Sequence, residues 1–306
     1  MGHRQKTGGV ISCRRSEETE GETLMMNVLR RRRVALFVLA LGLGLAGCGG
    51  LDKPMPAPVP APNPSERLLY ANLYLQTSAE YEALCLQTYA WASERLKAKL
   101  AALPKDGLPP AVVMDLDETV IDNGAFWAFL CREGLANSAA LWDVWERDLF
   151  VEVLLVPGAK DFIEEAGRLG AAVVYISNRD AAGREATVAT LRNLGLSLDG
   201  LDRRLMLMEG NSDKTGRRKK AEAMFRVVLW VGDNLRDFSN EFAVPMRLDS
   251  EADRFQALAD RREKVRRSSS RWGDDWIVLP NPVYGEWTKP ISSDPRKFLR
   301  PSKMKK

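Results

Sequence analysis

The stretch Ala111–Asn123, which reads AVVMDLDETVIDN, predicts a buried strand followed by two carboxylates. Its first four residues are apolar and follow two prolines, which is the length and boundary of a core strand. Asp115 and Asp117 then stand at the carboxyl end of that strand, where open α/β sheets bind their ligands. Two aspartates alone are equally consistent with an acidic loop that has no function. A site is therefore expected only if other parts of the chain supply partners.

The residues around this stretch alternate between short apolar runs and helical patterns. Further strands are expected at 171–176, 204–208, 227–231 and 276–279. Helices are expected at 161–169, 182–194 and 219–225. Strands separated by helices form parallel βαβ units, so we expect an α/β fold with a doubly wound parallel sheet and flanking helices. One or two amphipathic helices precede the sheet, and a small helical, aromatic insertion is expected at about 123–155.

The N-terminal part of the chain has the features of an export signal. Arg30–Arg33 form a cationic block, and the apolar run Val34–Ala46 that follows is too short to span a bilayer. The run ends in Leu45-Ala46-Gly47-Cys48, which resembles the bacterial lipobox. That resemblance implies cleavage before Cys48 and a lipid on Cys48. An N-terminal anchor that is never cleaved is the alternative.

These features divide the chain into five segments. They are residues 1–24, which precede the expected start at Met25 or Met26; the signal peptide, 25–47; the lipidated cysteine and a proline-rich tether, 48–64; the folded domain, 65–290; and a basic tail, 291–306.

Composition excludes several functions. Without residues 1–47 the chain carries 37 basic and 37 acidic side chains, so nothing in its overall charge points to a nucleic-acid polymer as partner. The single histidine, His3, precedes the signal, which excludes Ser-His-Asp catalysis, phosphohistidine chemistry and histidine-ligated zinc. Cys85 and Cys131 are an even pair in an exported chain, and the sequence leaves open whether they form a disulfide.

Three predicted strand ends and one lysine are expected to converge. The strand ends carry Asp115 and Asp117, Ser177 and Asn178, and Asp233 and Asp237, and the lysine is Lys214. Carboxylates without histidine suit a hard cation with oxygen ligands, Mg²⁺ before zinc. A cation and a lysine beside a carboxylate form a phosphate site, because they neutralise the phosphoryl oxygens.

These motifs in this order resemble the haloacid dehalogenase superfamily, and within it the class C acid phosphatases. They are DLDET (115–119), SNR (177–179), Lys214, GDNLRDF (232–238) and NPVYGEW (281–287), and the resemblance covers about Ser65 to Trp287. Class C acid phosphatases are exported bacterial lipoproteins that include 5′-nucleotidases. The resemblance implies a Mg²⁺-dependent acid phosphomonoesterase that forms an aspartyl-phosphate, acting on nucleoside 5′-monophosphates and other small phosphomonoesters outside the cytoplasm.

The resemblance also implies a role for each candidate residue. Asp115 is the expected nucleophile, and Asp117 the general acid and base. Ser177, Asn178 and Lys214 are expected to bind the phosphoryl group. The expected Mg²⁺ ligands are Asp115, Asp117 through its backbone carbonyl, Asp233 and Asp237. Tyr284 and Trp287 are candidates for stacking on a nucleobase, although core packing is the simpler role for either, and capping of a helix is the simpler role for Asp237.

Two other functions remain open at this point. One is a phosphotransferase that passes the phosphoryl group to an alcohol, and the other is a surface lipoprotein that binds nucleotide or metal without turnover. For localisation, Gly49 stands where an aspartate would indicate retention in the inner membrane. We therefore expect attachment to the outer membrane through Cys48, facing the periplasm or the cell surface. The exact substrate and the oligomeric state stay open.

Overall fold

The structure, a computed structural model, describes residues 66–147, 153–292 and 294–300. The predicted start, signal peptide, lipidated Cys48 and tether lie outside these residues, as does the end of the basic tail. Within the described ranges no helix has both the length and the apolar character needed to cross a membrane.

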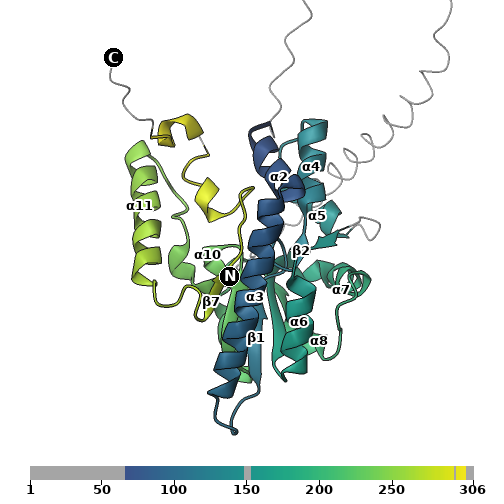
Figure 1. Ribbon diagram of the computed structural model, residues 1–306. Coiled ribbons are helices and arrows are strands. Elements are labelled where there is room, and N and C mark those ends of the chain that lie inside the picture. The colour runs from purple at the N-terminus through teal and green to yellow at the C-terminus, as the bar shows by residue number, and fades with distance from the viewer. Residues whose placement is uncertain (1–65, 148–152, 293, 301–306) are drawn as a thin grey trace, which may run out of the picture. The chain divides into compact units, whose positions relative to one another are not determined.

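A five-stranded sheet, all of whose strand pairs are parallel, forms the centre of residues 70–125 and 152–306 (Figure 1). The strand order is β5 (Leu205–Met208), β4 (Ala172–Asp180), β1 (Pro110–Met114), β6 (Arg226–Gly232) and β7 (Trp276–Val278). The strand β1, which opens the stretch Ala111–Asn123, is thus central, with Met114 in register with Tyr175 on one side and Val231 on the other. This confirms the predicted α/β fold with a parallel sheet.

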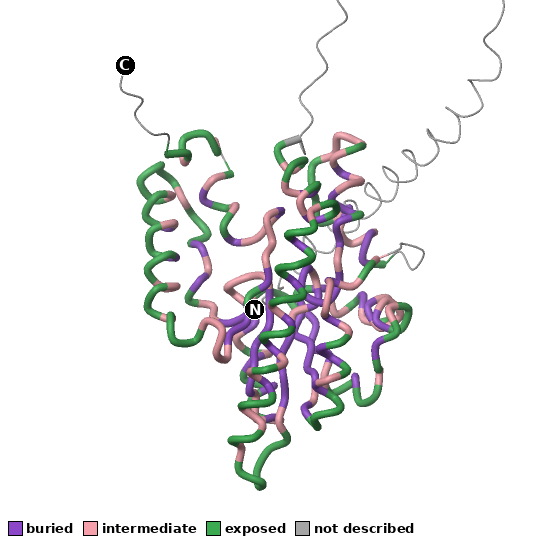
Figure 2. The backbone as a smooth tube through the Cα atoms, in the orientation of Figure 1, coloured by how far each residue is buried: buried purple, intermediate pink, exposed green. Residues whose placement is uncertain are grey.

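Helices cover both faces of the sheet, and its strands are therefore buried on both sides. Alternate residues of β1, Ala111 and Val113, join a core cluster with α9 (Thr215–Met224), α10 (Leu235–Phe238) and α11 (Glu251–Arg267). The opposite face is covered by α3 (Ala79–Ala101) and α6 (Ala159–Arg168), which lie in front of the sheet in Figure 1. Figure 2 shows the strands as buried and much of the helix surface as exposed.

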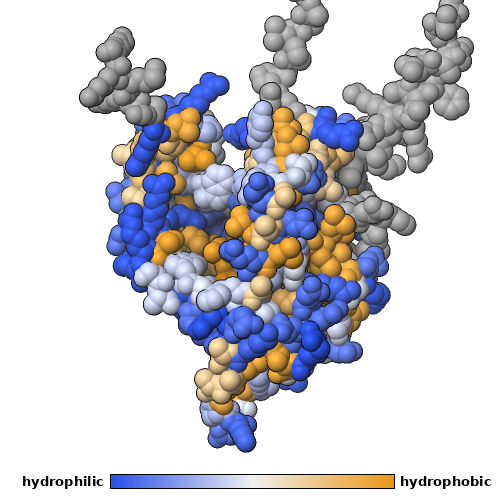
Figure 3. All heavy atoms as spheres, viewed as in Figure 1, coloured by the Kyte–Doolittle hydropathy of each residue, from blue (hydrophilic) through white to orange (hydrophobic). Residues whose placement is uncertain are grey.

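Several shorter helices make up most of the other regular structure of the described residues. They are α2 (Leu69–Thr77), α7 (Arg184–Asn193), α8 (Leu201–Arg204) and short 3₁₀ helices at Glu66–Leu68, Ala181–Gly183, Asn240–Phe242, Glu286–Thr288 and Pro295–Phe298. The long helix α3 begins where the Ser78 side chain accepts a hydrogen bond from the Tyr81 amide. Leu84, Leu86 and Trp91 of α3 are exposed. The side of the molecule drawn in Figure 3 has hydrophobic areas interspersed with hydrophilic ones.

The insertion is helical and aromatic, as predicted. Two short strands flank it, β2 (Ile121–Asp122) and β3 (Leu154–Leu155), which pair antiparallel. Its helices are α4 (Gly124–Glu133) and α5 (Ala139–Arg147). Aromatic rings of both helices pack together, with the Phe126 ring centroid 5.1 Å from those of Trp127 and Trp142. Among the described residues Cys85 is buried and Cys131 half-buried, and they do not form a disulfide with each other.

Candidate active site

A tight turn after β1 sets the positions of the two aspartates of DLDET. The Asp115 amide donates to the Val231 carbonyl (3.0 Å), which continues the pairing of β1 with β6 by one residue. The chain then turns sharply, because the amides of Val120 and Ile121 both donate to the Leu116 carbonyl. Glu118 adopts a left-handed φ of 54°, a conformation that costs energy for a residue with a Cβ. Such local strain is common at functional sites.

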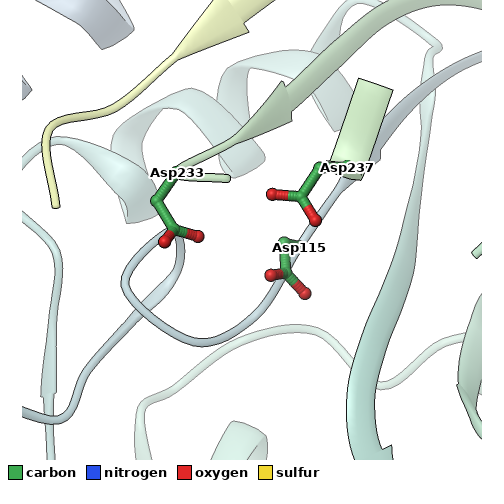
Figure 4. Close-up of side chains that lie close together, drawn as sticks. All are labelled: Asp115, Asp233 and Asp237. Carbon is green, nitrogen blue, oxygen red and sulfur yellow. The ribbon is translucent and has the colours of Figure 1, made fainter. Parts of the chain in front are cut away.

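Three carboxylates converge at the carboxyl end of the sheet (Figure 4). Asp115 follows β1, Asp233 follows β6 and Asp237 lies in α10, and one oxygen from each lies within 4.8 Å of the others. Asp237 also completes the capping box of α10, since its Oδ2 accepts a hydrogen bond from the Asn234 amide (2.9 Å). Helix capping and membership of the cluster are therefore compatible roles for this residue.

Gly232, the first residue of GDNLRDF, leaves no space for a side chain because Asp237 packs against it. A Cβ at this position would lie 2.4 Å from Oδ2 of Asp237 and 2.6 Å from its Cβ. Any side chain there would push Asp237 away from the other two carboxylates.

Lys214 joins two of the three carboxylates. Its Nζ lies 2.7 Å from Asp115 Oδ1 and 2.7 Å from Asp237 Oδ1, and only 4% of its side chain is exposed. Lys214 is the residue immediately before α9, so its side chain reaches the strand ends as predicted. α9 begins four residues earlier than expected, because the Asp213 side chain accepts the Thr215 amide (2.8 Å).

The electrostatics of the cluster leave an excess of negative charge. Burial raises the pKa of Asp115 to about 7, with the nearby carboxylates of Asp237 and Asp117 adding to the rise and Lys214 opposing it. Burial and the same kind of repulsion place the pKa of Asp233 well above its usual range. Burial works against the charge on Lys214, yet the two aspartates raise its pKa. One ammonium does not balance three carboxylates, so the donor set fits a divalent cation with oxygen ligands.

The carboxylate of Asp117 points away from this cluster to different partners. It accepts three hydrogen bonds from Arg179, the shortest 2.7 Å, and others from Asn123 (2.9 Å) and Ser177 (3.4 Å). The prediction gave Asp117 a metal contact only through its backbone carbonyl, and a carboxylate held by Arg179 is consistent with that.

Arg179, the last residue of SNR, contacts Asp117 in the site, although no role was predicted for it. Residues 177 and 179 lie two apart in β4, which extends to Asp180 rather than ending at 176 as predicted, and alternate residues of a strand share a face. That spacing was the available signal.

Of the predicted phosphate ligands, Ser177 contacts Asp117 (3.4 Å), Lys214 contacts Asp115 and Asp237, and Asn178 follows Ser177 in β4. Ser177 is buried, whereas Asn178 is exposed. Arg217, another residue without a predicted role, donates to the Ser177 carbonyl and to Asn178 Oδ1 (2.7 Å). The end of β4 is therefore tied to the first turn of α9.

The late motif NPVYGEW supports the acidic residues from a second side. Asn281 Nδ2 donates to Asp233 Oδ2 (2.8 Å), and the Tyr284 hydroxyl donates to the buried Glu118. Burial raises the pKa values of Glu118 and Tyr284 well above their usual ranges. Asn281, like Glu118, had no predicted role.

Trp287 is not brought to the carboxylate cluster by any described contact. It is 41% exposed and lines an apolar cavity of about 660 Å³ together with residues of α11 and with Ile291, Pro295, Phe298 and Leu299. Of the two predicted stacking residues, only Tyr284 therefore contacts a residue of the DLDET loop.

The fold and this site together define a phosphatase of the haloacid dehalogenase superfamily. Residues 60–287 match the family model described as HAD superfamily, subfamily IIIB (acid phosphatase). The chain belongs to this family, the class C acid phosphatases, and is a phosphomonoesterase. The match confirms the family and the enzyme class expected from the sequence.

Two solved structures are similar over most of their length. One is the class C acid phosphatase from Bacillus anthracis, with 30% identity, a TM-score of 0.66, and coverage of 75% of this chain and 90% of that chain. The other is the class C acid phosphatase from Bacillus anthracis with tungstate bound, with 29% identity, a TM-score of 0.66, and coverage of 77% and 94%.

Proposed function

We propose that this phosphomonoesterase depends on Mg²⁺, forms an aspartyl-phosphate on Asp115, and hydrolyses nucleoside 5′-monophosphates and other small phosphomonoesters. The observation that carries the proposal is the position of Lys214. Its ammonium group touches Asp115 and Asp237 at 2.7 Å inside a cluster of three carboxylates. A buried lysine among more carboxylates than it can neutralise suits a site for a dianionic phosphoryl group and a divalent cation.

The first half of the proposed reaction transfers the phosphoryl group to Asp115. A carboxylate oxygen of Asp115 attacks phosphorus while the bond to the leaving oxygen breaks, and Asp117 gives that oxygen a proton. Ser177 and Asn178 orient the phosphoryl oxygens, and Lys214 balances their charge and that of Asp115.

In the second half, water attacks phosphorus and the bond to Asp115 breaks. Asp117, now ionised, accepts the proton that the water loses. Mg²⁺ would be held by Asp115, Asp233, Asp237 and the Asp117 carbonyl, and it supplies positive charge close to the phosphoryl oxygens.

The cation is supported by the chemistry of the donor set. The cluster contains oxygen donors only, which favours Mg²⁺ over softer metals. Asp115 Oδ1 is buried and accepts no well-aligned hydrogen bond, although Lys214 Nζ is near, so this oxygen is available to a cation. Tungstate in one of the similar structures is a tetrahedral oxyanion like phosphate, which supports phosphoryl binding in this family.

The nucleotide preference rests on the family resemblance and on Tyr284, which is fixed beside the DLDET loop by Glu118. Transfer to an alcohol instead of water remains the second candidate. The same aspartyl-phosphate serves both reactions, and products formed with and without added glycerol distinguish them.

The proposed location is the outer membrane, by a lipid on Cys48, facing the periplasm or the cell surface. The order of cationic block, apolar run and Cys48 supports it. Labelled palmitate should enter the wild-type protein in bacterial cells and be absent from C48A. Equal labelling of C48A would refute the anchor.

A substrate screen tests the proposed activity. Purified protein lacking residues 1–48 is assayed against nucleoside 5′-monophosphates, sugar phosphates and p-nitrophenyl phosphate, each with Mg²⁺ and with EDTA. We expect phosphate release that requires Mg²⁺ and is fastest with nucleotides. Activity that survives EDTA and is not raised by Mg²⁺ would refute the metal assignment, and equal rates for all esters would refute the nucleotide preference.

A further inference from the structure

The carboxylate of Asp117 is held in one orientation by a buried arginine. Arg179 is 2% exposed, and its Nε and Nη2 both face Asp117. Nη2 lies 2.7 Å from Oδ1, and Nε lies 3.0 Å from Oδ1 and 3.2 Å from Oδ2. A planar guanidinium that approaches a carboxylate at two points fixes its rotation as well as its position.

The two oxygens of Asp117 are not equivalent in this arrangement. Oδ1 accepts hydrogen bonds from both Arg179 nitrogens and from Asn123 Nδ2 (2.9 Å). Among the described residues, the contacts of Oδ2 are two longer ones, from Arg179 Nε (3.2 Å) and from Ser177 Oγ (3.4 Å). Three donors fill the acceptor capacity of Oδ1, so a proton on Asp117 would sit on Oδ2.

We infer that Arg179 is the positioning residue for Asp117 and that it makes Oδ2 the oxygen that handles the proton. This inference rests on the proposed function, in which Asp117 acts as acid and base. When the phosphorus–oxygen bond of the substrate breaks, the proton on Oδ2 passes to the leaving alkoxide. When water later attacks the aspartyl-phosphate, Oδ2 takes the proton from that water, which returns Asp117 to its starting form.

The role is useful because general acid catalysis depends on geometry. A proton donor must lie within hydrogen-bond reach of the leaving oxygen as the bond breaks, and a freely rotating carboxyl group meets this condition only part of the time. Ser177 occupies the same strand two residues earlier, and its Oγ accepts the Arg179 amide (3.1 Å). The end of β4 therefore carries both the proposed phosphate ligand Ser177 and the arginine that orients Asp117.

The test exploits the leaving group. An alkyl phosphate such as a nucleoside 5′-monophosphate needs a proton on its leaving oxygen, whereas 2,4-dinitrophenyl phosphate releases a stable phenolate without one. The parameter kcat/KM reports transfer of the phosphoryl group to Asp115, the step in which the acid acts. We expect R179M to lower kcat/KM about 100-fold for the nucleotide and less than about 10-fold for the dinitrophenyl ester.

A double-mutant cycle adds a readout that a purely structural role would not move. In D117N the acid is already lost, so adding R179M should change kcat/KM for the nucleotide by less than about 3-fold. R261M is the matched control, because Arg261 of α11 is also buried but donates to the carbonyl of Phe242, in the 3₁₀ helix Asn240–Phe242. Its ratio of nucleotide to dinitrophenyl activity should equal that of the wild type.

The outcomes distinguish a failure of the proposed function from a failure of the role assigned to Arg179. A wild-type protein that hydrolyses neither ester would refute the proposed function, and a D117N variant that loses both esters equally would refute the acid role of Asp117. If D117N discriminates between the esters but R179M lowers both equally, or the double mutant is additive, the inference about Arg179 is overturned. Should R179M fail to fold, R179K keeps the charge, loses the two-point contact and is expected to show the same leaving-group pattern.

Discussion

Replacement of Lys214 by methionine tests the electrostatic arrangement of the site. The substitution keeps the length of the side chain and removes the ammonium group that contacts Asp115 and Asp237. At 2.7 Å and an effective dielectric constant of 20, each contact corresponds to about 6 kcal/mol of Coulomb attraction before desolvation is subtracted. Removal of one member of a buried ion pair costs about 3–5 kcal/mol, because its partners stay buried without compensation.

We therefore expect K214M to lose about 3–5 kcal/mol of unfolding free energy at pH 7.5 in EDTA. For a domain of this size that corresponds to a fall in Tm of roughly 6–20 °C. The loss should be smaller at pH 5, where protonation of Asp115, whose pKa burial raises to about 7, relieves part of the repulsion, and Mg²⁺ should restore part of it at pH 7.5. Phosphatase activity should fall by about 1,000-fold or more, because the phosphoryl oxygens and Asp115 lose their balancing charge.

Urea unfolding followed by tryptophan fluorescence measures the stability, with K219M as the matched control. Lys219 is exposed and lies in α9, the helix that Lys214 precedes, so K219M should change stability by less than about 0.5 kcal/mol. A K214M variant as stable as K219M, or equally destabilised at both pH values, would show that the lysine does not compensate the cluster.

Three further predictions concern the groups around Lys214. The raised pKa values of Asp115 and Asp233 mean that these two groups bind more protons in the native state than in the unfolded chain between about pH 4 and 7, so their contribution to the stability of the metal-free protein should fall as pH rises through this range, by at most about 1.4 kcal/mol per pH unit for each group; a Tm in EDTA that rises relative to that of D115N across this range would contradict this. N281A should weaken Mg²⁺ binding about 10–100-fold in titration calorimetry, because Asn281 orients Asp233 (2.8 Å), and unchanged affinity would exclude that role. Y284F should cost about 1–3 kcal/mol in urea unfolding, because Glu118 then lacks its hydroxyl donor, and a neutral effect would show that water replaces Tyr284.

Much of the site could be read from the sequence because its residues follow strands. Parallel strands place their carboxyl ends at one edge, so Asp115, Asp233 and Lys214 were expected to meet, and they do. The order of strands in the sheet and the exact element ends depend on pairing and capping. The extension of β4 to Asp180 is an example, since it follows from pairing with Met208 of β5.

The residues that the sequence did not reveal act through tertiary contacts. Arg179, Asn281 and Glu118 each bind a residue of the site from a distant part of the chain or from a strained turn. All three lie within motifs that carry the family resemblance, but apart from the two-residue spacing of Ser177 and Arg179 no local pattern indicated what they would contact. Trp287 donates a hydrogen bond to the Tyr284 carbonyl (3.1 Å) and also lines the apolar cavity beside α11, so its predicted stacking role stays a prediction.

The aspartyl-phosphate on Asp115 is the central claim, and trapping it is the most direct test. Wild-type protein, D117N and D115N are mixed with p-nitrophenyl phosphate and Mg²⁺, quenched in acid within milliseconds to seconds, digested and analysed by mass spectrometry. We predict that the peptide containing Asp115 gains the mass of one HPO₃ group in the wild type, that D117N accumulates more of it because the water step is slowed, and that D115N shows neither label nor phosphate release. Hydrolysis retained by D115N, or label on another residue, would contradict the account.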